Sequence, residues 1–143
     1  MEPLKSYHAQ YKNSKDDTSY NRNTANATGF GAAADDYAEK GIDLNEELVT
    51  NKLATFFMRV NGSAMIGAGI SNGDVVIVDR SIKATNGKIV IAVLNGEMLI
   101  RRLQIVSNKI RLVPETRNLL PIDVDPSSEF HIWGVVTYVI HKV

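Results

Sequence analysis

Two adjoining segments organise this chain: Phe57-Met58-Arg59-Val60-Asn61-Gly62-Ser63-Ala64-Met65-Ile66 and Gly69-Ile70-Ser71-Asn72-Gly73-Asp74-Val75-Val76-Ile77-Val78-Asp79. The first begins with alternating residues, as expected of a strand with one buried face, and then enters a short turn that contains glycine. The second passes through a Gly-Asp turn into a continuous apolar run, which is typical of a strand buried on both faces. The sequence therefore predicts two strands joined by compact turns.

The rest of the chain after Leu53 is also predicted to be β structure. An apolar run at 89–94 leads into Asn95-Gly96, a strong hairpin signal, and the return strand follows at 97–105. Further candidate strands lie at 109–113, 120–124 and 130–140. About seven short strands at close spacing predict a mostly β fold, either a compact, strongly bent antiparallel sheet or an open barrel.

The N-terminal part has a different composition. Residues 1–28 are rich in Asn, Ser and Thr and contain few large apolar groups, so we expect a flexible, extended arm. Residues 29–143 are expected to form one domain. This domain begins with a short helix over 42–48, in which Asp43 is the predicted N-cap. The arm shows no helix-turn-helix periodicity, so we expect no sequence-specific DNA binding.

The composition excludes several kinds of site. Lys and Arg number 16, as do Asp and Glu, so no net charge attracts the chain to nucleic acid or to an anionic membrane. The absence of cysteine excludes thiol chemistry and fits a cytoplasmic protein. No apolar run approaches the roughly 18 residues that span a membrane. His8, His131 and His141 lack metal-ligand spacing, so we expect neither a metal nor a cofactor.

The two opening segments resemble the core motif of the LexA/UmuD family of self-cleaving serine peptidases, roughly F-x-V-x-G-x-S-M followed by G-I-x-x-G-D-x-x-x-V-D. The resemblance extends to the strand at 97–103 and to Ile132-Trp133-Gly134-Val135-Val136. It implies the fold of the LexA C-terminal domain. It also implies that the residue before the Met is the nucleophilic serine, and this residue is Ala64 here. Its neighbours in the motif are Gly62, Ser63 and Met65.

The resemblance places the general base, a lysine in this family, at Arg101. Strand alternation independently puts Arg101 on one face with Leu99 and Leu103, among apolar neighbours. A buried lysine loses its proton near neutral pH and can then activate a serine, whereas an arginine, with a pKa above about 12, cannot. Self-cleavage is therefore predicted to be inactive. The alternative for Arg101 is an ordinary side chain that extends to solvent.

The segment that begins Gly29-Phe30-Gly31 resembles the cleavage site of UmuD-type proteins, which implies a scissile bond between Thr28 and Gly29. A β-branched residue before this bond departs from the family pattern and should fit a tight pocket poorly. Without the resemblance, the same residues would be interpreted as a flexible Gly/Ala linker.

The resemblance implies a homodimeric accessory protein of the SOS response to DNA damage. Its implied partners are the RecA filament on single-stranded DNA and a Y-family, UmuC-like DNA polymerase that carries out translesion synthesis. Three hypotheses stay open: a natural pseudo-peptidase, an active Ser-Lys self-peptidase captured as its Ser-to-Ala form, and a non-catalytic, β-rich interaction module.

Overall fold

The computed structural model describes residues 6–8 and 41–143. Residues 6–8 and 51–143 belong to one compact unit, which contains the sheet, and residues 41–50 belong to a second unit. In the second unit, helix α2 (Leu44–Leu48) begins after Asp43, whose carboxylate accepts hydrogen bonds from the backbone N–H groups of Asn45 and Glu46. The predicted short helix and its N-cap are thus confirmed.

The sheet contains eight strands, and every neighbouring pair is antiparallel. The strands are β1 (Ser6–His8), β2 (Thr55–Arg59), β3 (Val75–Asp79), β4 (Ile89–Leu94), β5 (Glu97–Val106), β6 (Lys109–Val113), β7 (Ile122–Asp123) and β8 (Phe130–Ile140). Their order is β1-β2-β3-β8-β4-β5-β6-β7, so β1 and β7 form the two edges and the sheet is not closed. The predicted mostly β, antiparallel fold class is confirmed.

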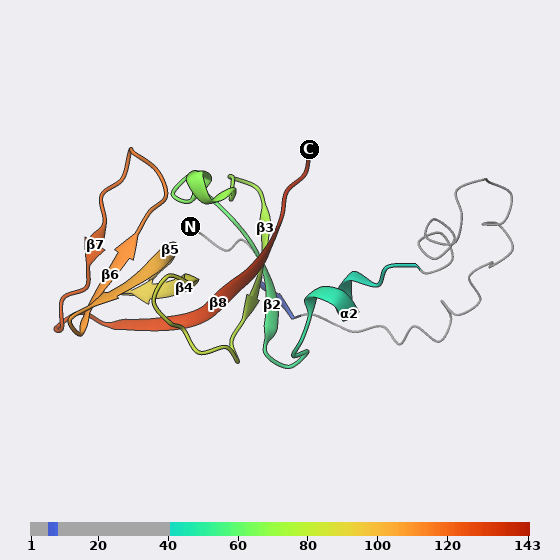
Figure 1. The fold of residues 1–143 in the computed structure, drawn as a ribbon, viewed down its shortest axis with the longest axis horizontal. Helices are drawn as coiled ribbons and strands as arrows, with labels where there is room; N and C mark the ends of the chain where they lie inside the picture. The colour runs from blue at the N-terminus through green and yellow to red at the C-terminus, as the bar shows by residue number, and fades with distance from the viewer. Residues whose placement is uncertain (1–5, 9–40) are drawn as a thin grey trace, which may run out of the picture. The chain divides into compact units, whose positions relative to one another are not determined.

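Strand β8 joins the two halves of the sheet (Figure 1). Its first half pairs with β4 and its second half with β3, and the register shifts once in each pairing. Such irregularities bend a strand and increase its twist. At Gly134 the backbone passes so close to β3 that an added Cβ would lie 2.6 Å from Cγ1 of Val78. Strand β8 can therefore pair with both β3 and β4, because it bends near Gly134, where the lack of a side chain lets its backbone approach β3.

The predicted hairpin turn is present, and one predicted strand is shorter than expected. Asn95 and Gly96 both have positive φ angles, as a two-residue hairpin turn between β4 and β5 requires. The strand predicted at 120–124 shrinks to β7, two residues long. Pro121 has no N–H to donate to a sheet, and Leu120 is exposed, so pairing begins only after them.

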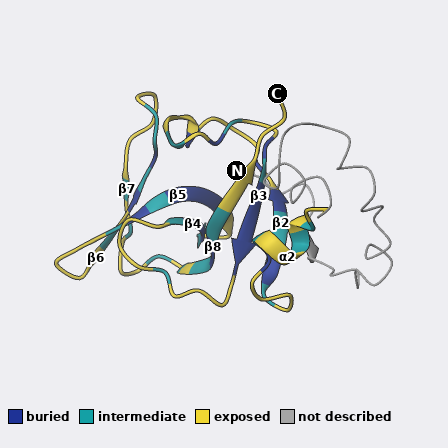
Figure 2. Ribbon diagram, turned by 45° about the vertical axis from the view of Figure 1, so that its right-hand side comes forward, coloured by how far each residue is buried: buried dark blue, intermediate teal, exposed yellow. Residues whose placement is uncertain are grey.

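The core consists of two clusters, and buried residues concentrate along the central strands (Figure 2). The first core cluster contains Met58, Val60, Met65, Ile70, Val76, Val78, Ile91 and Ile100. The second core cluster contains Val90, Ala92, Leu99, Leu103, Leu112 and Val135. Successive residues of β4 and β5 alternate between the clusters, so both faces of these strands are covered.

Candidate functional site

Position 64 lies in a tight turn that follows β2. Val60 donates its N–H to the carbonyl of Asp74, and its own carbonyl accepts the N–H of Gly73, at 2.8 Å in both cases. Gly62, with a φ of 118°, turns the chain away from the strand, and its N–H is bonded to Oδ1 of Asn72 at 2.7 Å. Hydrogen bonds therefore join residues 57–66 to residues 69–79 directly before position 64.

The Ala64 side chain packs against the first core cluster, and the next residue, Met65, is part of that cluster. The carbonyl of Ala64 accepts the N–H of Glu115 at 2.8 Å, and the carbonyl of Glu115 accepts the N–H of Gly67 at 2.7 Å. Gly67 belongs to the short 3-10 helix η3 (Ile66–Ala68). Ser63 is exposed. Main-chain hydrogen bonds on both sides thus hold the turn against the segment that follows β6.

Glu115 also connects this turn to β5. Its carboxylate lies 2.6 Å from Nε of Arg102, and Arg102 donates from Nη1 to the carbonyl of Gly87 at 2.7 Å. Arg102 is paired with Val113, the last residue of β6. Position 64 and position 102 therefore share Glu115 as a common neighbour.

Arg101 is buried, with 8% of its surface exposed, and does not extend into solvent. Its Nη1 donates to the carbonyl of Ile100 at 2.8 Å, while its Nε is buried without a hydrogen-bond partner. Burial lowers the pKa of Arg101, and the negative charge of Glu97 partly opposes this effect. An arginine stays protonated in a protein even so, because its ordinary pKa lies far above neutral pH. A fixed cation thus occupies the position that the resemblance assigns to the base.

The structure places the two predicted catalytic residues beside different core clusters. Arg101 lies on the same face of β5 as Leu99 and Leu103 of the second core cluster, whereas Ala64 packs against the first core cluster. Among the hydrogen bonds of the described residues, none joins Ala64 to Arg101, so their direct apposition stays a prediction. Thr28 and Gly29 lie outside the described residues. The predicted arm includes β1 at residues 6–8, and its remainder also lies outside them.

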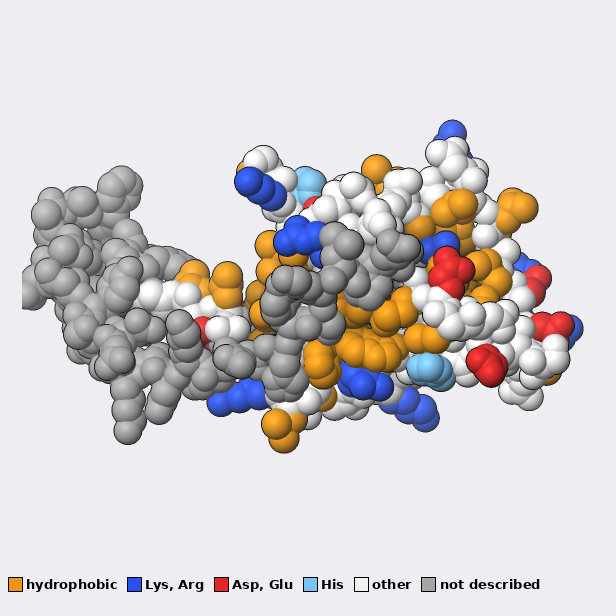
Figure 3. Space-filling model, turned by 180° about the vertical axis from the view of Figure 1, so that it is seen from behind, with side chains coloured by type: hydrophobic (Ala, Val, Ile, Leu, Met, Phe, Trp, Pro, Cys, Tyr) orange, Lys and Arg blue, Asp and Glu red, His pale blue; other side chains and the backbone are white. Residues whose placement is uncertain are grey.

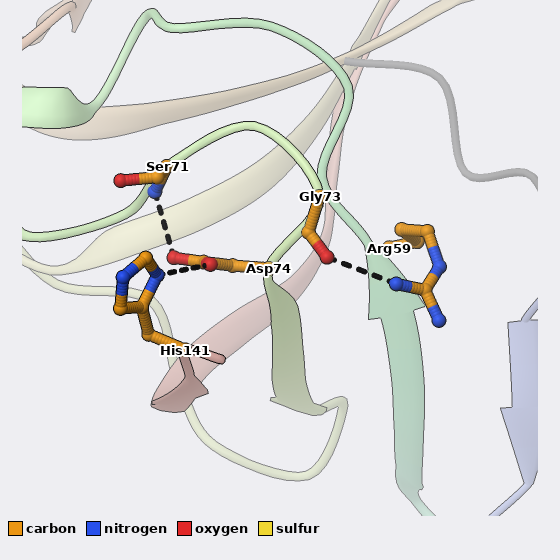
Figure 4. A network of polar contacts seen from close by, with 5 residues as sticks. All are labelled: Arg59, Ser71, Gly73, Asp74 and His141. Atoms are coloured by element: carbon orange, nitrogen blue, oxygen red, sulfur yellow. Dashed lines mark hydrogen bonds and ion pairs between the residues drawn. The ribbon is translucent and has the colours of Figure 1, made fainter. Parts of the chain in front are cut away.

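Sequence reasoning missed a second polar group beside this turn (Figure 4). Asp74 is buried; its Oδ2 accepts the N–H of Ser71 at 2.8 Å, and its Oδ1 lies 2.6 Å from Nδ1 of His141. Burial raises the pKa of Asp74, but the hydrogen bonds from Ser71 and His141 outweigh burial and lower it overall. The Gly-Asp turn was a local signal for Asp74. No local signal in the sequence indicated that His141 would be the partner of Asp74.

Within residues 6–8 and 41–143, no group of three or more His, Asp or Glu residues could hold a metal ion. No helix in that part of the chain is long and apolar enough to cross a membrane.

The open antiparallel sheet and the turn at position 64 define a serine peptidase fold of the LexA C-terminal type. Residues 23–137 match the Peptidase S24-like family, and the chain belongs to this family. Its relatives include the protein ImpA of Salmonella typhimurium, which is 41% identical over 118 residues, 80% of this chain and 77% of ImpA. Protein MucA of Escherichia coli is 37% identical over 113 residues, 78% of this chain and 77% of MucA. The LexA repressor of Oleidesulfovibrio alaskensis is 43% identical over 93 residues, 65% of this chain and 45% of the repressor. The family predicted from the motifs is confirmed.

Proposed function

We propose that this chain is a UmuD-like accessory protein of the SOS response that acts by binding and does not cleave itself. The proposal assigns residues 1–28 to an arm and residues 29–143 to the peptidase-fold domain. Its proposed partners are a second copy of the chain, the RecA filament on single-stranded DNA, and a Y-family, UmuC-like polymerase. Membership of the Peptidase S24-like family and the similarity to ImpA and MucA support this assignment.

The observation that carries the proposal is the pair of side chains at the two catalytic positions. Attack on a peptide bond needs a hydroxyl or thiol, and Ala64 supplies only a methyl group that packs against the core. Proton abstraction needs an unprotonated base, and Arg101 is a buried cation. Removing one member of a catalytic pair costs several orders of magnitude in rate, and here both are replaced.

Apolar side chains at the surface support a binding role. Tyr138, Val139 and Ile140, at the end of β8, keep 46%, 38% and 46% of their surface exposed. Figure 3 shows hydrophobic groups gathered over the sheet on one face, with charges of both signs around them. Exposed apolar groups that gather on one face are typical of protein interfaces.

The test of self-cleavage is an intact-mass measurement of the full chain after incubation with RecA, single-stranded DNA and nucleotide. We expect one species at the full mass. A fragment that begins at Gly29 would refute the proposal. The single variants Ala64→Ser and Arg101→Lys should also stay uncut, because each restores only one of the two groups, and the double variant should be cleaved. Adding Ser63→Ala to the double variant is the control, because cleavage should persist.

The same variants separate the remaining hypotheses. If the single variant Ala64→Ser cleaved itself, this result would favour an active self-peptidase in its serine form. It would also mean that position 101 is not the position of the general base. The binding role is tested by retention of a Y-family polymerase and of RecA filaments on the immobilised full chain. Retention of neither would leave a β-rich interaction module with a different partner.

A further inference from the structure

The arginine that directly follows β3 lies across β8 and over the single tryptophan of the chain. The stem of Arg80 passes over the bend of β8, since a Cβ added at Gly134 would lie 3.3 Å from Cγ of Arg80. Its Cζ lies 4.5 Å from the centre of the Trp133 ring, and its Nε donates to the carbonyl of Trp133 at 2.8 Å. The side chain of Arg80 is therefore held by β8 along its length.

The ring below the guanidinium is itself fixed. Trp133 is partly buried and packs against the first core cluster. The ring of Phe56 meets it edge-on, with the ring centres 5.1 Å apart and the planes at 63°. The backbone N–H of Arg80 donates to the carbonyl of Ala54 at 2.8 Å, which joins it to the segment before β2. A side chain that is already ordered loses little further freedom when it binds a ligand.

The outer groups of this guanidinium are left without a partner in the described part of the chain. Arg80 is exposed, and its side-chain hydrogen bond uses Nε. Nη1 and Nη2 take no part in the hydrogen bonds and salt bridges of the described residues. The neighbouring carboxylate, that of Asp79, is buried and accepts the N–H and the hydroxyl of Ser81. A permanent cation with free, oriented donors is thus presented to solvent, and such a fork binds carboxylate or phosphate oxygens.

The surroundings of Arg80 favour a carboxylate of a protein over a phosphate of a nucleic acid. Leu53, next to Ala54, is 85% exposed, and Ile82 is 38% exposed. Lys83 adds one exposed positive charge, while the whole chain has no net charge. Nucleic-acid binding relies on several cations along the phosphate backbone and gains nothing from exposed aliphatic groups. One oriented cation among apolar side chains is instead suited to an acidic residue that has apolar neighbours.

We propose that Arg80, oriented by Trp133, is the anchor of a protein-docking surface that takes an Asp or Glu side chain of a partner. The carboxylate accepts hydrogen bonds from Nη1 and Nη2, and the apolar neighbours of this acidic residue contact Leu53 and Ile82. Arginine and tryptophan are the residue types that most often dominate binding energy at protein interfaces. The inference goes beyond the proposed function, because it needs neither the residues at positions 64 and 101 nor any of the partners proposed above.

The test begins with selection of binders to the immobilised full chain from a random peptide library that lacks tryptophan. Affinities of the selected peptides are then measured through the fluorescence of Trp133. We expect the peptides to share an Asp or Glu with apolar neighbours. Arg80→Lys, which keeps the charge but loses the fork, should weaken binding about tenfold. Lys83→Gln is the matched control, because it removes an exposed cation that has no such support, and it should weaken binding less than about twofold.

A double-mutant cycle assigns the contact to the two side chains. Replacing the acidic residue of the peptide with Gln or Asn should weaken binding to the unmodified chain about tenfold and have little further effect on Arg80→Lys. Circular dichroism and urea denaturation confirm that the variants fold, so that only affinities are compared.

Several results would overturn the proposal. They are a selection that yields no binders, selected peptides without a common acidic residue, and equal affinity of the peptides for Arg80→Lys. Displacement of the peptides by an equal concentration of oligothymidylate would assign the guanidinium to phosphate and would also overturn it. None of these results bears on self-cleavage or on retention of the polymerase, so the proposed function is tested separately.

Discussion

Replacing Arg101 with Met should stabilise this domain. The guanidinium is buried, and its Nε has no hydrogen-bond partner, which costs about 1–3 kcal/mol for a buried donor. The substitution gives up the bond from the charged Nη1 to the carbonyl of Ile100, which contributes about 1.5–3 kcal/mol, but it also removes the desolvation penalty of a buried cation, which is several kcal/mol. Met has an apolar chain of similar length, which suits the neighbouring Leu99 and Leu103. The net expectation is a gain of about 1–2 kcal/mol in the free energy of unfolding.

Urea denaturation followed by the fluorescence of Trp133, the single tryptophan, measures this gain. A gain of about 1 kcal/mol raises the melting temperature by about 3–4 °C in a domain of this size. Arg102→Met is the matched control, because its partly exposed ion pair with Glu115 contributes about 1 kcal/mol at most, so this change should be slightly destabilising. If Arg101→Met were as destabilising as Arg102→Met, the idea that position 101 holds an uncompensated buried cation would be wrong.

Three further substitutions test other contacts. Gly67→Ala should cost about 1–3 kcal/mol, because its Cβ would lie 2.7 Å from the carbonyl oxygen of Glu115 and would force the turn at position 64 to shift; denaturation of the variant checks this. Gly134→Ala should be destabilising through contact with Val78, and a double-mutant cycle with Val78→Ala should show a favourable coupling. The lowered pKa of Asp74 means that its stabilisation is complete above about pH 4 and is lost as the pH falls through its folded value; stability measured against pH should therefore fall less steeply below about pH 4 in Asp74→Asn.

Local patterns in the sequence predicted most of the fold. The hairpin at Asn95-Gly96 and the cap at Asp43 depend on residues close in the chain, and both are present. The alternation of β5 between the two core clusters, with Leu99 and Leu103 on the same face, is also as predicted. Positive φ angles and short-range hydrogen bonds have residue preferences that a single sequence displays.

Contacts between distant segments could not be predicted in this way. Glu115 contacts both the turn at position 64 and Arg102, and nothing near Glu115 in the sequence indicates either partner. The same is true of the pairing between Asp74 and His141. Such contacts follow from the bend of β8 and from the order of the strands, which depend on the packing of the whole sheet.

The way in which the turn at position 64 is attached has an evolutionary consequence. The group through which position 64 binds Glu115 is its main-chain carbonyl, which every amino acid presents alike. A serine and an alanine are therefore held in the same place and at the same angle. The proposed nucleophile position can therefore exchange serine and alanine through one substitution without rebuilding the turn.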